Sequence, residues 1–428
     1  MKTIKYFILI WTIGFMPVSC IVDMDLQEVP KDFFSPENAY TDRAGFESAL
    51  ADIYRMIRTN MYMNTDAADN WDMMGIDLDF TSMGTKAAGW GDYFYWNTLN
   101  PDAGFSSRWW PRYYDWIFKA NVIINRAEDG LVKWTSEEEK NQIVGEAMFL
   151  RAFGYHFLAN LFGDVPLVLQ ETNAPKFDYV REPVQNVYQQ CKTDLEFAVK
   201  WMKTVDQQPG GRAPRAAACH LLSEVNICLG DYAGAVAAAS EVINDPNFQL
   251  MTERFGVRAN FTFNGYDYQG EQEPWGDVFW DLFQEGNMNW SEGNREAIWN
   301  IEMDVTLTGG GNTTQWGGNF GLERHWGTNW WGIADKNGTS NWLKDTLSGR
   351  PVGSMKTTEY AGTQIWQYKD DWDRDMRNSK YNIKREYYWT NPAGEFYGQL
   401  MQAEHAGDPS TFHLPPTFMK GITTVHYG

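Results

Sequence analysis

The sequence predicts an all-α protein built as a helical solenoid, with long loop-rich insertions and an irregular C-terminal part. Three observations lead to this fold class. A long helix with capping signals at both ends lies in the first half of the chain. Apolar residues on either side of it recur at three- and four-residue intervals, which is the period of an amphipathic helix. After Gln249 this period mostly stops, and Gly, Asn and Trp become frequent.

The central helix is predicted within residues 136–167. Ser136 and Glu139 have the spacing of a capping box, and three glutamates in the first turn suit the positive end of the helix dipole. Gly163 supplies a C-terminal stop, with Pro166 just beyond it. The small residues that let neighbouring helices approach are Gly145, Ala147, Ala152, Gly154 and Ala159. Since apolar groups occur almost all the way round, the helix is expected to be buried on several sides.

Further helices are predicted over residues 46–61, from Arg108 onward, over residues 181–202, and after Pro214. In the second of these, Trp109, Trp110 and Tyr113 are assigned to packing. Residues 229–246 combine a glycine turn, an anchoring tyrosine at Tyr232, small contact residues and a final proline. This is nearly the second half of a tetratricopeptide repeat. Helix pairs of that kind need neighbours to bury their faces, so a tetratricopeptide-like solenoid is expected.

Two regions lack sustained periodicity. Residues 64–107 are rich in Gly, Asp, Asn and aromatic residues, and a loop of that length within a compact domain is usually functional or disordered. The aromatic content argues against disorder. Residues 251–428 form a second loop-rich region. The predicted organisation is therefore a helical domain over residues 46–250 with a loop insertion at 64–107, followed by the loop-rich region 251–428.

The run EAMFLRAFGYHFLANLFGDVPL at residues 146–167 closely resembles the signature of the SusD/RagB family. That family comprises surface glycan-binding lipoproteins of Bacteroidetes that cap TonB-dependent outer-membrane transporters. The resemblance covers residues 25–246 well and residues 366–385 modestly. It implies a non-catalytic, cell-surface subunit that hands oligosaccharide to a SusC-like TonB-dependent transporter barrel. The family normally continues with another long helical pair, which is not found here, so the C-terminal region is expected to be truncated or diverged.

The N-terminus has the pattern of a bacterial lipoprotein. Residues 1–19 contain a charged start, a short apolar run and a small-residue processing site, which together predict a signal peptide. Cys20 follows this site and resembles the lipidated cysteine of a lipobox. Ordinary signal cleavage with a free cysteine is the alternative. Residues 20–45 are predicted to form the anchor and a tether, which places the protein at the outer membrane, facing outward.

Composition and motifs exclude several function classes. The chain has 56 acidic and 36 basic residues, so strong nucleic-acid binding is not expected. The usual hydrolase, metalloprotease and phosphate-loop motifs are missing, so neither a catalytic site nor a cofactor is predicted. Asp371, Asp373 and Asp375 alternate as in a calcium loop, but Met376 occupies the position that needs glycine, so no metal site is predicted.

Oligosaccharide binding without turnover is the predicted function. Sugar rings present apolar C–H faces that stack on aromatic side chains, while their hydroxyl groups need polar partners. The candidate ligand-binding residues in the two irregular regions are Trp71, Trp90, Tyr93, Trp96, Asn97, Trp316, Trp326, Trp330 and Trp331. For any single tryptophan, core packing is at least as probable as ligand contact. Binding of peptide or another non-sugar nutrient is the runner-up, and a glycoside hydrolase, which needs two suitably spaced carboxylates, comes third.

Overall fold

A computed structural model of the chain describes residues 39–62, 104–172, 174–263, 273–302, 328–341, 362–409, 412, 414 and 416–418. The α-helices are α3 (Arg43–Ile57), α5 (Gly104–Glu128), α6 (Glu137–Phe162), α7 (Val184–Trp201), α8 (Arg215–Cys228), α9 (Tyr232–Ile243) and α10 (Val278–Asp281). The short helical turns are η1 (Arg58–Tyr62), η4 (Val205–Gln207), η5 (Gly256–Arg258), η6 (Trp290–Glu292), η7 (Gln364–Trp366), η8 (Tyr368–Asp370), η9 (Met376–Asn378) and η10 (Ala403–His405). Two antiparallel strand pairs complete the list: β1 (Thr262–Phe263) with β2 (Glu273–Pro274), and β3 (Ile383–Lys384) with β4 (Thr417–Phe418).

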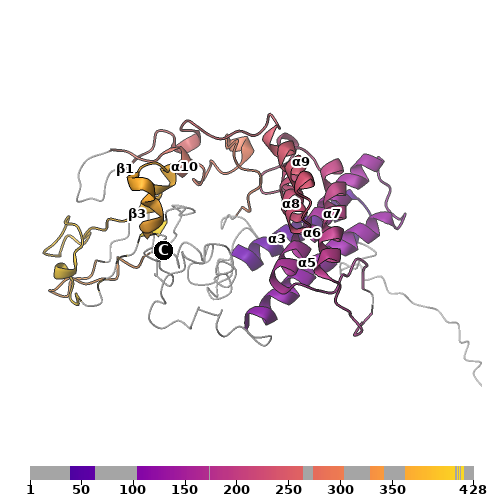
Figure 1. Ribbon diagram of the computed structural model, residues 1–428, viewed down its shortest axis with the longest axis horizontal. Helices are drawn as coiled ribbons and strands as arrows, with labels where there is room; N and C mark the ends of the chain where they lie inside the picture. The colour runs from indigo at the N-terminus through magenta and orange to yellow at the C-terminus, as the bar shows by residue number, and fades with distance from the viewer. Residues whose placement is uncertain are drawn as a thin grey trace, which may run out of the picture.

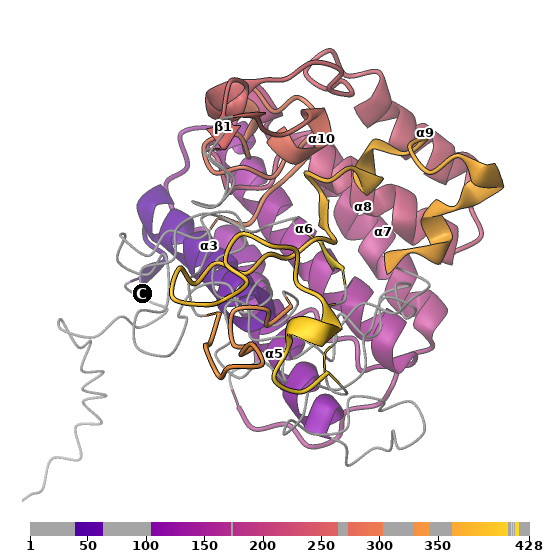
Figure 2. The same cartoon turned by 90° about the vertical axis from the view of Figure 1, so that its left-hand side faces the viewer.

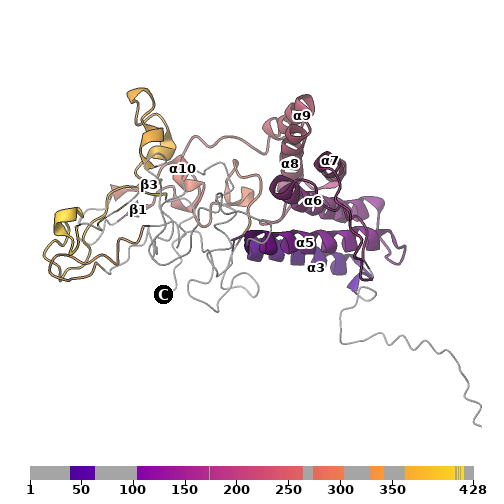
Figure 3. The same cartoon turned by 60° about the horizontal axis from the view of Figure 1, so that its bottom comes forward.

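The predicted all-α fold class is confirmed. Helices α3 and α5 to α9 stack so that each contacts the next along the chain. They gather on one side of the molecule, while residues 256–263, 273–302 and 362–409 form the loop-rich side (Figure 1). Figure 2 shows that second side in front of the stack. Helices α3 and α5 lie along one edge of the stack, and α8 and α9 form the opposite edge (Figure 3). Within the described residues, no helix is both long enough and apolar enough to span a membrane.

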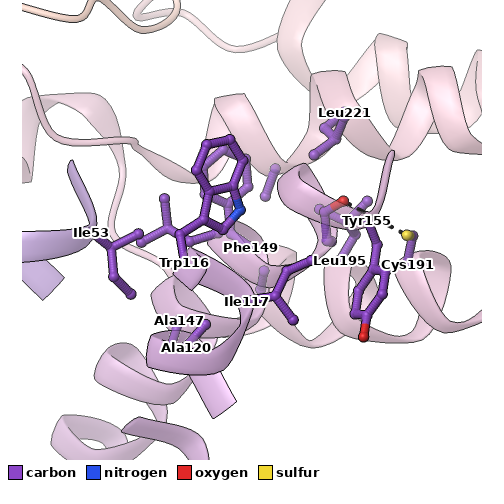
Figure 4. Close-up of a cluster of buried hydrophobic side chains, with 14 of the residues drawn as sticks. Ile53, Trp116, Ile117, Ala120, Ala147, Phe149, Tyr155, Cys191, Leu195 and Leu221 are labelled. Carbon is purple, nitrogen blue, oxygen red and sulfur yellow. Dashed lines mark hydrogen bonds between the residues drawn. The ribbon is translucent and has the colours of Figure 1, made fainter. Parts of the chain in front are cut away.

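Helix α6 lies at the centre of the stack because it is apolar on most of its circumference. Phe149, Leu150 and Tyr155 are completely buried. Figure 4 shows α5 and α6 side chains such as Trp116, Ala120 and Ala147 meeting in this core. The α6 backbone ends at Gly163, whose φ of 70° is a left-handed conformation that glycine adopts without strain.

The N-terminus of α6 differs in one detail from the predicted capping box. The Ser136 hydroxyl accepts from the Glu139 N–H at 3.1 Å, as expected. Glu139 reaches back one residue further than predicted, because its carboxylate accepts from the backbone N–H of Thr135 at 2.7 Å and from the Thr135 hydroxyl at 2.6 Å. Arg43 of α3 donates to the same carboxylate at 3.2 Å. The cap therefore also joins α6 to the first helix of the stack.

This cap makes the stability of the helical stack depend on pH. The Thr135 hydrogen bonds, followed by Arg43, lower the pKa of Glu139 below its ordinary value. Ionised Glu139 therefore stabilises the fold above the unfolded-state pKa of about 4.3, and this contribution is lost as the pH falls through the lower, folded-state pKa. We expect the wild type to lose unfolding free energy on acidification more steeply than Glu139→Gln, in denaturant titrations across that range. Glu137→Gln, which leaves the Thr135 bonds in place, is the matched control. Parallel pH profiles for wild type and Glu139→Gln would contradict this assignment.

A buried ionic network ties three consecutive helices together. Arg151 of α6 makes two 2.7 Å hydrogen bonds to Asp194 of α7, and both side chains are almost fully buried. The third guanidinium nitrogen donates to Asn121 of α5 at 2.9 Å. Asn121 in turn donates to the Val168 carbonyl at 2.8 Å. The network fixes the relative positions of α5, α6 and α7, and it also holds the first residues of the chain that leaves α6.

Trp299, from the loop-rich side, makes a contact with the helical stack. Trp299 donates from its indole nitrogen to the Gly211 carbonyl at 3.1 Å. Its ring packs edge-on against the aromatic rings of Tyr54, Phe149 and Phe153. A cavity of about 30 Å³, room for about one water molecule, lies between the turn at residues 209–212 and the segment at 289–300.

Glu146, in the central helix α6, stabilises the turn at residues 209–212 that Trp299 contacts. Its carboxylate is buried and accepts from the Tyr54 hydroxyl at 2.7 Å and from the Arg212 guanidinium at 2.6 Å. Arg212 also pairs with Glu47 of α3. The residue that begins the recognised run at 146–167 thus connects α3, α6 and the turn that precedes α8.

One predicted packing role at the far edge of the stack is wrong. Tyr232 was expected to anchor the α8–α9 pair, but it is 68% exposed. The α8–α9 contact uses Ala235 and Ala238 instead, both of which are buried. In a repeat array, a tyrosine on the outer face becomes an anchor only when the next helix packs on it. Among the described residues, α9 is the last long helix.

Candidate functional site

Most of the predicted ligand-binding residues lie outside the described residues, namely Trp71, Trp90, Tyr93, Trp96, Asn97, Trp316 and Trp326. Their roles stay predictions. Trp330 and Trp331 are described, and both belong to a small aromatic core on the loop-rich side. Its buried members are Trp330, Tyr387, Trp389, Phe396 and Met401. Trp331 is half-buried and packs against that core.

The assignment of Trp330 to ligand contact is wrong. The side chain is 1% exposed, and the ammonium of Lys384 lies 4.7 Å from the centroid of its ring. A sugar therefore has no access to the indole face. Asn341 helps to fix this core, since its amide oxygen accepts from the backbone N–H and the hydroxyl of Thr390, each at 2.6 Å. The sequence did not indicate the burial because the residues that cover Trp330 come from about fifty positions further along the chain.

Other aromatic rings on the loop-rich side are covered by cations of the protein itself. The guanidinium of Arg295 lies 3.9 Å from the Trp290 ring centroid, and that of Arg385 lies 4.8 Å from Trp372. Such contacts stabilise each ring by about 0.5–2 kcal/mol. They also occupy a face that would otherwise be available for stacking. At least some of the tryptophans in this region therefore stabilise the fold.

An open depression with a different character lies on the surface of α5. Trp110, Tyr114 and Phe118 follow one another at four-residue intervals and so form a stripe along one face of the helix. The depression has a volume of about 610 Å³ and is lined by Asn60, Trp110, Pro111, Arg112, Tyr114, Asp115 and Phe118. Its volume falls within the range of about 300–1,000 Å³ that is usual for small-molecule sites. Phe118 is 41% exposed at its edge.

The opposite face of α5 packs into the core of the helical stack. Trp109, Tyr113 and Trp116 are completely buried, which confirms the packing role predicted for the first two. Trp110, which was also assigned to packing, is half-buried: it packs against the core and edge-on against Phe162 of α6, and it also lines the depression. The periodicity of residues 110, 114 and 118 was the available signal, but it could not show that one stripe faces outward.

Tyr114 is held in place by its hydroxyl group, which donates to the Pro166 carbonyl at 2.7 Å. Burial raises the pKa of this phenol well above its usual value. Asn60, Arg112 and Asp115 add amide, guanidinium and carboxylate groups around the rings. Rings beside such polar groups match the two requirements of a sugar, an apolar face and hydroxyl groups.

The depression does not have the composition of a hydrolytic site. Glycoside hydrolysis ordinarily needs two carboxyl groups on either side of the scissile bond. Asp115 is the one carboxylate among the described residues that line the depression. No group of three or more His, Cys, Asp or Glu side chains in the described parts of the chain is arranged to hold a metal ion. Asp375, from the alternating aspartates, pairs with the guanidinium of Arg377 and caps η9.

The position of the depression in the chain connects it to the predicted loop insertion. Asn60 belongs to η1, the last described turn before residues 64–107, and α5 begins at Gly104, just before the insertion ends. The residues that line the depression therefore flank the predicted insertion on both sides. That insertion carries five of the predicted ligand-binding residues.

Comparison with known proteins relates the helical part of the chain to a family. Residues 32–227, a little under half of the chain, match a family model described as "Starch-binding associating with outer membrane", the SusD-like model. This part of the chain is similar to the SusD-like proteins. SusD-like protein P2 of Formosa agariphila is 29% identical over 233 residues, which are 54% of this chain and 45% of that protein. SusD-like protein P25 of the same organism is 23% identical over 53% of this chain and 44% of that protein. The chain thus matches about half the length of these curated relatives.

Solved structures of SusD-like proteins share the fold. A SusD superfamily protein from Bacteroides vulgatus superposes with a TM-score of 0.58 at 15% identity, over 90% of this chain and 70% of that one. A SusD-like carbohydrate binding protein from Bacteroides fragilis gives 0.55 at 18% identity, over 89% and 68%. Surface glycan-binding protein A from Bacteroides fluxus gives 0.53 at 19% identity, over 80% and 64%. The tetratricopeptide-like helical fold predicted from the sequence is therefore that of the SusD-like proteins.

Proposed function

We propose that this protein binds oligosaccharide without turnover in the depression on α5. The observation that carries the proposal is the stripe of Trp110, Tyr114 and Phe118, of which Phe118 is exposed and the other two are half-buried, beside amide, guanidinium and carboxylate groups. Each ring offers an apolar face to a sugar, and the polar groups can hydrogen-bond the sugar's hydroxyl groups. Without such partners, removing those hydroxyl groups from water would cost free energy. The names printed for several relatives, a carbohydrate binding protein and a surface glycan-binding protein, support this ligand class.

The proposal extends to location and delivery. Lipidation at Cys20 after removal of residues 1–19 would fix the protein to the outer membrane through a tether over residues 20–45. The bound oligosaccharide would then pass to a SusC-like TonB-dependent transporter barrel. The family description, which mentions association with the outer membrane, supports the location. In this arrangement the helical domain at 46–250 is the frame, and the loop-rich region 251–428 adds contacts to the ligand or the barrel.

Replacing Phe118 tests the ligand site. Phe118 is partly exposed at the edge of the depression, so Phe118→Ala removes a stacking surface with little effect on the core. We expect about tenfold weaker binding, which corresponds to about 1.4 kcal/mol. The measurement is isothermal titration or an affinity gel with a panel of neutral α- and β-glucan oligosaccharides.

Tyr232→Ala is the matched control for this experiment. Tyr232 is an exposed aromatic residue on α9, at the opposite edge of the stack from α5 (Figure 3). Its replacement is expected to leave the affinity unchanged. Peptide binding by the wild type with no response to any glycan would favour the runner-up function. Release of new reducing ends from the glycans would favour a hydrolase instead.

A further inference from the structure

Helix α3, which packs beside α5 (Figure 3), ends in a π-helical turn at the wall of the depression. The turn is η1 (Arg58–Tyr62), and it follows α3 directly, since the α-helix ends at Ile57. A π turn closes its backbone hydrogen bonds over five residues instead of four, and such turns are rare and frequently occur at functional sites. Asn60 is the middle residue of this turn and lines the depression.

The π turn changes which residue continues the buried face of α3. The buried residues of this face recur at intervals of four, three and four, as Phe46, Leu50, Ile53 and Ile57. Continued as an α-helix, the series would reach Asn60, three residues after Ile57. In the structure Met61 takes that place and is 6% exposed, whereas Asn60 is half-buried. The wider turn therefore moves the amide off the buried face and toward the depression.

The amide of Asn60 is available to a ligand. Among the residues that the structure describes, none forms a hydrogen bond with its side chain. An asparagine amide carries two donors and an acceptor with two lone pairs. Each hydroxyl group of a sugar can both donate and accept, so one amide can pair with two adjacent hydroxyl groups. The rings of the depression make no such distinction, because stacking uses only the apolar face of the sugar.

The neighbours of Asn60 hold the turn in place. On one side, the guanidinium of Arg58 donates to the Glu302 carbonyl on the loop-rich side at 3.4 Å. On the other side, Met61 belongs to the core of the helical stack. Asn60 therefore lies between two residues that are each fixed by tertiary contacts.

We propose that the π turn is a positioning element of the oligosaccharide site, and that it presents the amide of Asn60 to two adjacent hydroxyl groups of the bound sugar. This inference rests on the proposed function and deepens it. It assigns selectivity for free, adjacent hydroxyl groups to one side chain, because a sugar without them would leave the half-buried amide unpaired.

The test is a double-mutant cycle on the full-length chain, measured as the affinity for the neutral oligosaccharide that the wild type binds best. Asn60→Ala is expected to weaken binding about tenfold through the loss of its hydrogen bonds. Deletion of Thr59, an exposed residue of the turn, is expected to weaken binding to a similar extent. Asn60→Ala added to the deletion is expected to have no further effect. Thr59→Ala, which keeps the length of the turn, is the matched control and should bind as the wild type does.

The deletion acts by restoring the α-helical period. Without Thr59, Met61 comes three residues after Ile57 and stays on the buried face. Asn60 then comes two residues after Ile57, and residues two apart on an α-helix point to nearly opposite sides. The two deletion variants, with and without Asn60→Ala, share one backbone, so a loss of stability caused by the deletion cancels when they are compared.

The outcomes separate this inference from the proposed function. If Phe118→Ala weakens binding and Asn60→Ala does not, the role of Asn60 is overturned while the site on α5 stands. If the deletion keeps the wild-type affinity, or if its effect and that of Asn60→Ala add, the π turn does not act through Asn60 and its positioning role is wrong. If neither Phe118→Ala nor Asn60→Ala changes an affinity that the wild type shows, the site on α5 is overturned as well.

Discussion

Arg151→Ala is expected to lower the free energy of unfolding by about 3–5 kcal/mol, because it leaves the buried carboxylate of Asp194 without its partner. Arg151 is 4% exposed and Asp194 2% at the side-chain level, so water cannot replace the lost hydrogen bonds. Gln190 would remain as a donor to Asp194 at 2.8 Å, but a neutral amide does not compensate a buried charge. Chemical denaturation followed by circular dichroism measures the effect.

Two further variants make this prediction specific. Lys140→Ala breaks an ion pair with Glu128, a residue that is 62% exposed, and is expected to cost at most about 1 kcal/mol. The double variant Arg151→Met with Asp194→Leu removes both charges and is expected to recover much of the stability lost in Arg151→Ala. A loss below about 1 kcal/mol for Arg151→Ala would show that the network is accessible to water.

The same substitution has a functional consequence. Arg151 orients Asn121, and Asn121 donates to the Val168 carbonyl in the segment that follows α6. Loss of the guanidinium frees Asn121 from this constraint. Val168 lies two residues after Pro166, whose carbonyl holds the hydroxyl of Tyr114 in the depression. Residual folded Arg151→Ala protein should therefore bind oligosaccharide more weakly than the wild type.

Gly154→Ala is expected to destabilise the protein by about 1–3 kcal/mol through overpacking between α5 and α6. A Cβ atom at this position would lie 2.1 Å from the indole nitrogen of Trp116 and 2.9 Å from Cγ1 of Ile117. Both side chains are almost completely buried and cannot move aside freely. The gain of about 1 kcal/mol from replacing glycine in a helix interior is smaller than this cost.

Gly145→Ala, on the same helix, is the matched control. Its Cβ would meet Trp201, Ala198 and Met202 at 3.5–3.7 Å, which is ordinary van der Waals contact. Helix propensity should then dominate, and the variant is expected to be as stable as the wild type or more stable by up to about 1 kcal/mol. Equal unfolding midpoints for the two variants would contradict the close approach of α5 and α6 at Gly154.

The helical part of the fold was largely predictable because its signals are local. The period of the apolar residues and the caps of α6 come from positions three or four residues apart, and these spacings decide where a helix forms and ends. Ser136 and Gly163 mark the ends of α6 in the structure as they do in the sequence. The run at residues 146–167 also indicated the family. Its glutamate and arginine, Glu146 and Arg151, are the residues that connect neighbouring elements in the core.

The candidate site was much less predictable, because exposure depends on contacts between distant positions. Trp330 and Trp110 both occur in aromatic, polar surroundings in the sequence. The first is buried under residues 384–401, whereas the second borders an open depression.

The sequence by itself therefore determined the all-α class, the order of the helices and the resemblance to the SusD-like proteins, since each depends on residue spacing along one segment. Only the tertiary structure decided which aromatic rings are exposed and which have a face covered by the cation of Lys384, Arg385 or Arg295. The physical reason is that an aromatic ring can be stabilised by burial in a core, by a cation over its face or by a stacked sugar ring. Which of these it meets depends on the parts of the chain that the fold brings beside it.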